Sequence, residues 1–285
     1  MLAVMGATGK TGGTVLAELR RRGVPARGLT RDAGRSAWQA GLIEADPFDP
    51  DSLVKAFDGC HGAYVLIPPL IHAADVLAMG KAIAEAIAEA VGRAGLRHVV
   101  ALSSGGVHLA HGIGPIRSML DLEHALRRTG ASLTLIRAAD FMENWAGVAL
   151  VARTDGVLPS ALLPLDRPMQ TVSTLDIGRL AASCLLEPDR GERIINLLGP
   201  ADYTPNEMGL AFARQLGRPV TVVPLPREAL PGALAEAGIG QDYARGLIEI
   251  YDGLNAGRIT FEPGMGETRR GSVTIDEAVR RMLTD

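Results

Sequence analysis

A glycine-rich turn close to the start of the chain constrains its fold more than any other feature of the sequence. The run from Gly6 to Gly12 reads GATGKTG. It follows an apolar stretch, Leu2–Met5, that is typical of a β-strand, and it leads into Thr11–Arg22, whose apolar residues have helical spacing. A G-x-x-G-x-x-G run between a strand and a helix is typical of a dinucleotide-binding βαβ unit.

Each glycine of this run has a separate expected role. Gly6 allows a tight turn, Gly9 lets the backbone approach a pyrophosphate, and Gly12 lets the helix pack close to the strand. The first amides of the helix are free to bind phosphate oxygens. We therefore expect the loop to contact the cofactor through Gly6, Thr8, Gly9, Lys10, Thr11 and Gly12.

The first half of the chain alternates short strand-like runs with helix-period segments, which indicates a parallel sheet covered on both faces. The expected strands are Leu2–Met5, Ala26–Thr30, Leu42–Ala45, Ala63–Ile67, His98–Ser103 and Ser132–Arg137. The expected helices are Thr11–Arg22, Ser52–Phe57, Ile71–Ala94 and Ile116–Arg128. The fold class is therefore α/β, a doubly wound parallel-sheet Rossmann fold with a smaller C-terminal substrate lobe.

The residue that follows the second expected strand bears on which dinucleotide binds. NAD sites usually have an acidic residue there, for the ribose hydroxyls. Here the strand is followed by Arg31, whose guanidinium can contact a 2′-phosphate, and Arg35 could assist. Two alternatives remain open: Asp32 could turn inward if the strand is one residue longer, and Arg31 could be a solvated loop cation. The pattern favours NADP(H) over NAD(H).

Three further segments are expected to line the cofactor, because ligands bind outside the carboxyl ends of strands in such sheets. Asp46, after the third strand, either bonds the adenine amino group or caps its own loop. Ile67 and Pro68 follow the fourth strand, and Ser103 ends the fifth, so we expect these three residues near the nicotinamide.

Beyond about Asp140 the alternation weakens, and proline and glycine become frequent. Asp176 is predicted to cap a helix over residues 177–186, and residues 193–198 are predicted to form a strand. A capping box from Thr204 to Glu207 predicts the start of a helix that runs to Leu216, and a strand over 220–223 is expected after it. We expect residues 1–150, with 170–198 returning to them, to form the NADP-binding domain. Residues 151–169 and 199–285 then form mainly the substrate lobe.

Composition excludes several other classes of protein. The net charge is −3 and both signs are dispersed along the chain, so the sequence has no cluster of basic residues of the kind that binds nucleic acid or an anionic membrane. The two cysteines have no metal-binding spacing, and no apolar run reaches transmembrane length. No basic leader precedes the first strand. We expect a soluble cytoplasmic protein without a metal, either a monomer or a homodimer.

With these features the chain resembles the NmrA-like branch of the atypical short-chain dehydrogenases. The stretch Leu135–Asn144, LIRAADFMEN, is close to the family signature ilRpxxfmEN. The other matching segments are Gly6–Gly12, Leu29–Asp32, Ala45–Asp46, Asp51–Leu53, Leu102–Ser104, Asp176–Arg179 and Leu216–Val220. The resemblance implies an NAD(P)-binding fold over nearly the whole chain; the family includes reductases, redox sensors and regulators.

The usual acid of short-chain dehydrogenases is missing from the sequence. Those enzymes protonate the reduced carbonyl with a Tyr-x-x-x-Lys pair, and none of the four tyrosines here has a lysine four residues on. Many NmrA-like relatives keep a lysine four residues before the glutamate that matches Glu123, but here that residue is Met119. Hydride transfer is still possible to an acceptor that needs no strong proton donor, such as a quinone or a cationic dye.

The catalytic residues cannot be named from the sequence, but several polar candidates should lie near the nicotinamide. Ser104 follows the fifth strand, and His108 and His111 lie in the glycine-rich loop after it, where they are either proton donors or solvated residues. Asn144 either borders the substrate cleft, as the resemblance implies, or ties the two lobes together.

An apolar, partly aromatic pocket is expected between the two lobes. Its candidate residues, which could equally be core, are Phe141, Met142, Trp145, Leu162, Leu163, Met169, Tyr243, Ile250 and Tyr251. The leading hypothesis is an NAD(P)H-dependent oxidoreductase that transfers hydride to a quinone-like or conjugated aromatic substrate without a Tyr-x-x-x-Lys pair. The alternatives are a non-catalytic NADP(H)-binding redox sensor and a repurposed enzyme of non-redox chemistry.

Overall fold

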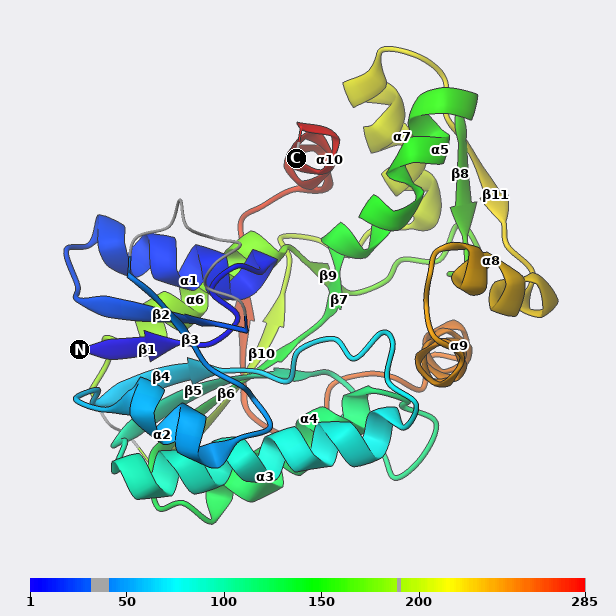
Figure 1. Cartoon of the computed structure of the whole chain (residues 1–285). Coiled ribbons are helices and arrows are strands. Elements are labelled where there is room, and N and C mark those ends of the chain that lie inside the picture. Colours follow the sequence, from blue (N-terminus) through cyan, green and yellow to red (C-terminus); the bar gives the residue numbers. More distant parts are fainter. Residues whose placement is uncertain (32–40, 189–190, 285) are drawn as a thin grey trace.

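The centre of the molecule is a parallel sheet of eight strands in the order β12-β10-β6-β5-β4-β1-β2-β3 (Figure 1). The computed structural model describes residues 1–31, 41–188 and 191–284, so Asp32 and Arg35 lie outside the described residues. The strands are β1 (Leu2–Val4), β2 (Ala26–Thr30), β3 (Leu42–Glu44), β4 (Gly62–Val65), β5 (His98–Ser104), β6 (Ser132–Ala138), β10 (Glu192–Leu198) and β12 (Glu267–Arg270). The predicted doubly wound parallel sheet is confirmed.

The order in which the chain adds strands to the sheet reverses at β1. Leu2 is in register with Ala26 of β2 on one side and with Gly62 of β4 on the other. The chain fills the sheet outward to β3 first, and then runs from β4 to β6 on the other side of β1. Such a switch point opens a crevice at the carboxyl ends of the two central strands, where ligands of this fold class bind.

Helices cover both faces of the sheet (Figure 1). α1 (Lys10–Arg21) and α6 (Thr174–Cys184) pack side by side on one face. α2 (Pro50–Phe57), α3 (Val76–Ala94) and α4 (Ile116–Arg127) cover the other. Alternate residues of one strand enter the two resulting cores: in β4, Ala63 and Val65 join the core with α3, whereas Tyr64 joins the core with α1. Strands buried on both faces explain the near-continuous apolar runs in the sequence.

The second lobe has a core of its own, which includes Met142, Trp145, Met169 and Phe212. Its elements are β7 (Asp140–Phe141), the 3-10 helix η2 (Met142–Val148), α5 (Ala149–Asp155), β8 (Val157–Ser160), β9 (Thr171–Val172), α7 (Pro205–Leu216), β11 (Thr221–Pro224), the 3-10 helix η3 (Arg227–Ala229), α8 (Leu230–Glu236), α9 (Gln241–Asn255) and α10 (Ile275–Thr284). The capping box predicted for α7 is confirmed, because Thr204 and Glu207 bond each other's backbone amides.

Two expectations about these elements are corrected, and one strand had not been expected. α3 begins at Val76 behind the cap Asp75, five residues later than predicted. α6 is capped by Ser173 rather than Asp176; the Asp176 carboxylate instead accepts a hydrogen bond from the backbone of Val273 and so ties α6 to the chain before α10. Strand β12 was not predicted, because its residues, Glu267–Arg270, are polar and the strand lies at the sheet edge.

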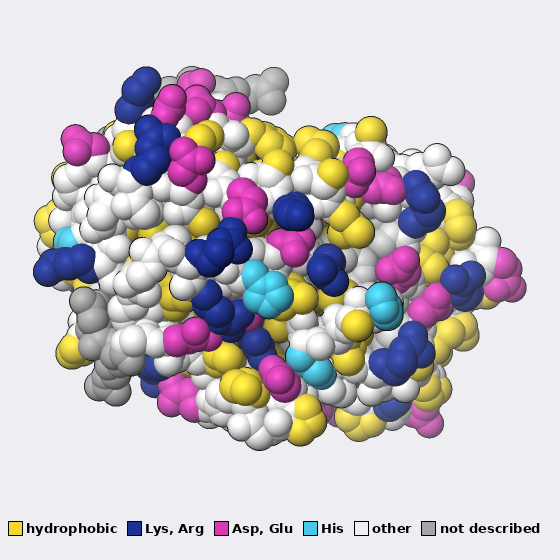
Figure 2. Space-filling view, turned by 90° about the horizontal axis from the view of Figure 1, so that it is seen from below, with side chains coloured by type: hydrophobic (Ala, Val, Ile, Leu, Met, Phe, Trp, Pro, Cys, Tyr) yellow, Lys and Arg dark blue, Asp and Glu magenta, His cyan; other side chains and the backbone are white. Residues whose placement is uncertain are grey.

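The face that carries α2, α3 and α4 mixes charges of both signs. Figure 2 shows lysine, arginine, aspartate and glutamate side chains interspersed across it, without a broad patch of one sign. Within residues 1–31, 41–188 and 191–284, none of the helices combines the length and the apolar character that a membrane span requires.

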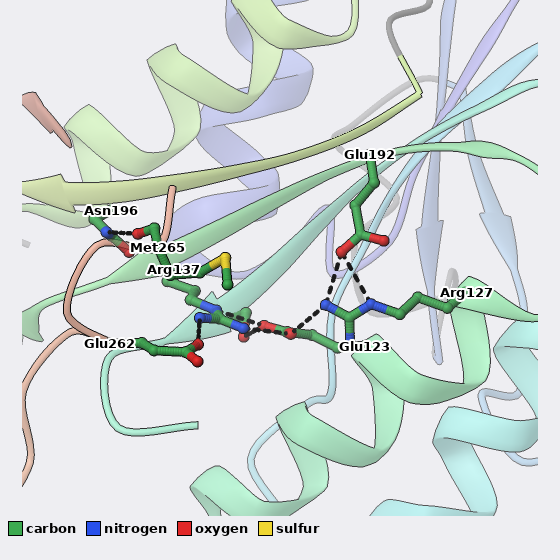
Figure 3. A network of polar contacts seen from close by, with 8 residues as sticks. Glu123, Arg127, Arg137, Glu192, Asn196, Glu262 and Met265 are labelled. Carbon is green, nitrogen blue, oxygen red and sulfur yellow. Dashed lines mark hydrogen bonds and ion pairs between the residues drawn. The ribbon is translucent and has the colours of Figure 1, made fainter. Parts of the chain in front are cut away.

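A buried ion pair joins α4 to the sheet (Figure 3). The Arg137 guanidinium of β6 donates to both carboxylate oxygens of Glu123, at 3.0 and 2.9 Å, and the Ser103 hydroxyl of β5 donates to the same carboxylate at 2.6 Å. Arg137 also donates to Glu262, which belongs to the segment before β12. Burial by itself would raise the pKa of Glu123, but the hydrogen bonds from Arg137 and Ser103 outweigh it and hold the pKa below its ordinary value of 4.5.

Replacing Glu123 by glutamine should destabilise the protein by roughly 3 kcal/mol, because it removes the buried partner that accepts two hydrogen bonds from Arg137 and leaves the guanidinium with only the partly exposed Glu262 as an ion-pair partner. The exposed pair Glu85–Arg128 offers the control, and Glu85→Gln should cost less than about 1 kcal/mol. Urea unfolding measures both. Because the native pKa of Glu123 lies below 4.5, its stabilisation is present above that pH and is lost as the pH falls through the native pKa. Equal losses in the two variants would contradict a structural role for the buried pair.

Candidate functional site

A cleft of about 950 Å³ lies at the carboxyl ends of the central strands. It runs from the glycine loop and the end of β2 to the segment after β4, the start of α4 and the second lobe. Of the residues predicted to bind the cofactor, those that line it are Gly6, Thr8, Gly9, Lys10, Thr11, Arg31, Ile67 and Pro68. The cleft therefore gathers residues from segments that are far apart in the chain.

The glycine loop forms one end of the cleft. Gly6 adopts a φ of +63°, and Gly9 is the N-cap of α1 without a side-chain hydrogen bond. The first amides of α1 therefore face the cleft without a side-chain cap and can donate to anionic oxygens. Gly12 does not line the cleft; a Cβ there would lie 2.3 Å from the Gly6 carbonyl oxygen and 2.4 Å from that of Met5. Its role is the close packing of helix against strand that the sequence predicts.

The variant Gly12→Ala should lose roughly 1–3 kcal/mol of stability, because backbone atoms that cannot rotate away surround the added methyl group. Gly92→Ala is the matched control: this glycine also lies in a helix, but nothing stands within 4 Å of the added Cβ. The control should gain up to about 1 kcal/mol from helix propensity. Thermal unfolding of both variants decides the point, and a Gly12→Ala protein as stable as wild type would contradict the packing argument.

The cationic residues of the cleft lie at this same end. Arg31 is exposed at the end of β2 and, together with Lys10, lines the cleft. Ala45 and Pro47 of the loop after β3 line it as well, whereas Asp46 does not. The Asp46 carboxylate accepts a hydrogen bond from the Phe48 amide at 2.9 Å, which is the loop-capping alternative that the sequence left open.

The opposite end of the cleft is mostly apolar. Its wall is formed by Ile67, Pro68, Met119, Phe141 and Tyr243, the last of which lies on α9. Ser103, predicted here, is not a lining residue: its side chain is 2% exposed and donates to Glu123 on the α4 side of the sheet. The physical reason is strand alternation, which turns Ser103 away from the side that Leu102 presents to the cleft.

Of the polar candidates that the sequence offered, some line the cleft in the structure and others do not. Asn144 lines the cleft, and its side-chain amide donates to Asp140 Oδ1 at 2.8 Å. Its neighbour Glu143 ties the lobes instead, by accepting hydrogen bonds from the Ser173 hydroxyl and the Thr174 amide at the start of α6. His108 and His111 line neither this cleft nor the second cavity described below, and the buried His108 Nδ1 has no partner among the described residues.

A second cavity of about 220 Å³ adjoins the apolar end of the cleft. Ser104, Asp140 and Phe261 are among its lining residues, and the Ser104 hydroxyl donates to the Gly105 carbonyl oxygen. Burial raises the pKa of Asp140 to about 6, with Glu143 adding to the increase, although hydrogen bonds from Asn144 and the Phe141 backbone act in the opposite direction. In the sequence, Asp140 stands out only as part of the family signature. An acidic residue two positions after the end of a central strand was the signal that could have identified it.

The family follows from a match along most of the chain. The model of the NmrA-like family matches residues 1–270. The chain belongs to the NmrA-like family. This confirms the resemblance seen in the sequence. In the structure the arginine of the shared signature is the buried Arg137, its glutamate, Glu143, accepts hydrogen bonds at the start of α6, and its asparagine, Asn144, lines the cleft.

Relatives of this NmrA-like protein include several reductases. It is 28% identical over 238 residues to the (4-alkanoyl-5-oxo-2,5-dihydrofuran-3-yl)methyl phosphate reductase of Streptomyces griseus, covering 82% of this chain and 80% of that one. Triphenylmethane reductase of Citrobacter sp., solved with NADP(H), superposes with a TM-score of 0.79 at 21% identity over 99% of both chains. The NADPH-bound quinone oxidoreductase of Escherichia coli gives 0.79 at 22% identity, over 99% of this chain and 100% of that one.

Proposed function

We propose that this protein is an NADPH-dependent oxidoreductase that transfers a hydride to a quinone-like or conjugated aromatic substrate. The observation that carries the proposal is the single 950 Å³ cleft, which joins a phosphate-binding glycine loop to an apolar end. A dinucleotide needs the first and a flat organic substrate needs the second. The reductase names of the relatives support the same assignment.

The residues at the loop end fit NADP(H). The uncapped amides of α1 would hold the pyrophosphate, and Arg31 with Lys10 would pair with the 2′-phosphate. Ile67 and Pro68 would border the nicotinamide, whose reduced form supplies a hydride when it is bound. Asp46, whose carboxylate caps its own loop, is left out of this assignment.

The apolar end provides proximity and exclusion of water rather than a tyrosine–lysine acid. Met119 occupies the cleft wall where many relatives have lysine, and Phe141 and Tyr243 form an aromatic wall. A substrate stacked between these side chains and the nicotinamide would be held at the distance that hydride transfer requires. A quinone accepts the hydride readily, and its reduced anion takes a proton from water.

Met119 also supports a second candidate function, that of a redox sensor. A cleft that binds NADP(H) without the lysine could distinguish the two oxidation states without turnover. The sensor would be favoured by two results together: unequal affinity for NADP⁺ and NADPH, and no oxidation of NADPH with any acceptor tested. Rapid turnover would eliminate it.

The substitution Arg31→Ala should weaken NADPH binding by about 10- to 100-fold, because charge-assisted hydrogen bonds to the 2′-phosphate are lost. NADH, which lacks that phosphate, should bind with nearly unchanged affinity. Fluorescence titration of both cofactors measures the difference, with Arg21→Ala, an exposed arginine on α1 outside the cleft, as the control. Equal losses for NADPH and NADH would show that the 2′-phosphate binds elsewhere.

Purified protein should oxidise NADPH when menadione or another simple quinone is added, because such acceptors need only proximity to the nicotinamide. The absorbance of NADPH at its reduced-nicotinamide band follows the reaction. Absence of turnover with a panel of quinones and triphenylmethane dyes, in a sample in which titration shows NADPH bound, would contradict the proposed oxidoreductase.

A further inference from the structure

The charges that line the cleft stand at one end of it. Among the described residues that line the cleft, Lys10 and Arg31 are the only ones with an ionised side chain, and none is an aspartate or a glutamate. Both lie at the phosphate end, where they would pair with the 2′-phosphate of the cofactor. The lining residues at the apolar end therefore offer neither a cation nor an anion to a substrate.

Acidic residues do stand beside the apolar end in the sequence, but the protein itself engages their carboxylates. Asp242 precedes the lining residue Tyr243 and accepts a hydrogen bond from the Val76 amide at 2.8 Å, which ties α9 to the start of α3. Glu143 precedes the lining residue Asn144 and is engaged by a hydroxyl and an amide at the start of α6. Neither acid lines the cleft.

Two further charged residues that adjoin lining residues also stay out of the cleft. Asp140 precedes Phe141, but it lines the second cavity instead. Arg117 precedes Ser118; it is exposed, and its guanidinium lies 3.6 Å from the Asp121 carboxylate of the same helix. The apolar end is therefore neutral because of how the chain folds, and not because its segments lack charges.

The helix that carries Tyr243 is packed too closely to turn one of its acids into the cleft. A Cβ on Gly114 would lie 2.2 Å from the Gly246 carbonyl oxygen of α9, and a Cβ on Gly246 would lie 2.6 Å from Pro115 Cδ. Glu249, also on α9, accepts a hydrogen bond from the Gly114 amide at 3.2 Å. Backbone in such close contact fixes the rotation of α9 about its axis.

A substrate that carries a charge would lose its hydration at the apolar end without gaining a partner. Burial of an unpaired charge costs far more than burial of an uncharged ring. The aromatic faces of Phe141 and Tyr243 attract a partly hydrated cation only modestly. The cations at the phosphate end are engaged by the cofactor in the proposed function, so an anionic substrate would find no free one.

Met119 is the lining residue at which this neutrality can be changed. Its side chain is half-buried in the cleft wall, near the start of α4. Lysine and glutamate have unbranched side chains of similar length and are good helix formers, so either charge can be placed in the wall without disturbing the helix.

We propose that the substrate of this protein is an uncharged molecule, and that Met119 is a specificity-determining residue because it gives neither a cation nor an anion a partner. The inference rests on the proposed oxidoreductase function and narrows it. Uncharged quinones and other uncharged conjugated aromatic compounds are accepted, whereas sulfonated quinones and cationic dyes are excluded.

The test measures, by calorimetry, the affinity of the NADP⁺-bound protein for three oxidised aromatic compounds, to which NADP⁺ has no hydride to transfer. They are the uncharged 2-(hydroxymethyl)anthraquinone, the anionic anthraquinone-2-sulfonate and the cationic dye crystal violet. Wild type should bind the uncharged anthraquinone at least about tenfold more tightly than the sulfonate, which has the same ring system. Met119→Lys should improve sulfonate binding about 10- to 100-fold relative to the uncharged compound, and Met119→Glu should do the same for crystal violet, because each variant supplies one charge-assisted contact.

Leu77 supplies the matched control. It is an exposed residue of α3 that lines neither the cleft nor the second cavity. Leu77→Lys and Leu77→Glu add the same charges in solvent, where they are screened, and should leave the ratios of affinities within about twofold of wild type. NADPH affinity reports whether each variant is folded.

The outcomes separate this inference from the proposed function. A sulfonate bound as tightly as the uncharged anthraquinone, or Met119 variants whose ratios match those of the Leu77 controls, would overturn the inference. Oxidation of NADPH by wild type with menadione would leave the oxidoreductase function standing in that case. A wild type that binds none of the three compounds and oxidises no NADPH with menadione overturns both.

Discussion

The buried pair between Glu123 and Arg137 fixes the geometry on which the site depends. It joins α4 to β6, takes a hydrogen bond from Ser103 of β5, and reaches the C-terminal segment through Glu262. Charges are stable in such a position only when their hydrogen bonds are nearly all satisfied, which leaves little freedom in how these elements pack. The cleft wall at the start of α4 and the carboxyl ends of β5 and β6 are thereby held at set distances from one another.

The two ends of the cleft differ because of the way the sheet is wound. The glycine loop follows the first central strand, so helix amides and cationic side chains gather there. The chain after β6 leaves the sheet for the second lobe, and it contributes Phe141 and Asn144 to the opposite end. One parallel sheet thus supplies an anion-binding end and an apolar end within a single space, which is the arrangement that hydride transfer from a dinucleotide to an organic molecule requires.

Membership in the NmrA-like family accounts for the fold, and one departure from the pattern that the resemblance implies bears on chemistry. Met119 gives the cleft wall an apolar side chain where the resemblance implies a lysine in many relatives. An apolar wall favours acceptors that are electrophilic enough to take a hydride without a proton donor beside them.

The sequence alone determined the sheet, the helices on its two faces and the phosphate-binding loop, because strand runs, helix periodicity and the spacing of Gly6, Gly9 and Gly12 are local properties. It did not determine the edge strand Glu267–Arg270, whose polar residues carry no strand pattern, or the cap of α6, which is Ser173 and not the predicted Asp176. Nor could it show that Ser103 faces a buried glutamate, or that Asp140 borders a cavity with Tyr251 nearby. Those facts depend on residues far apart in the chain, and only their packing decides which side chain loses water, which finds a partner, and which faces the cleft.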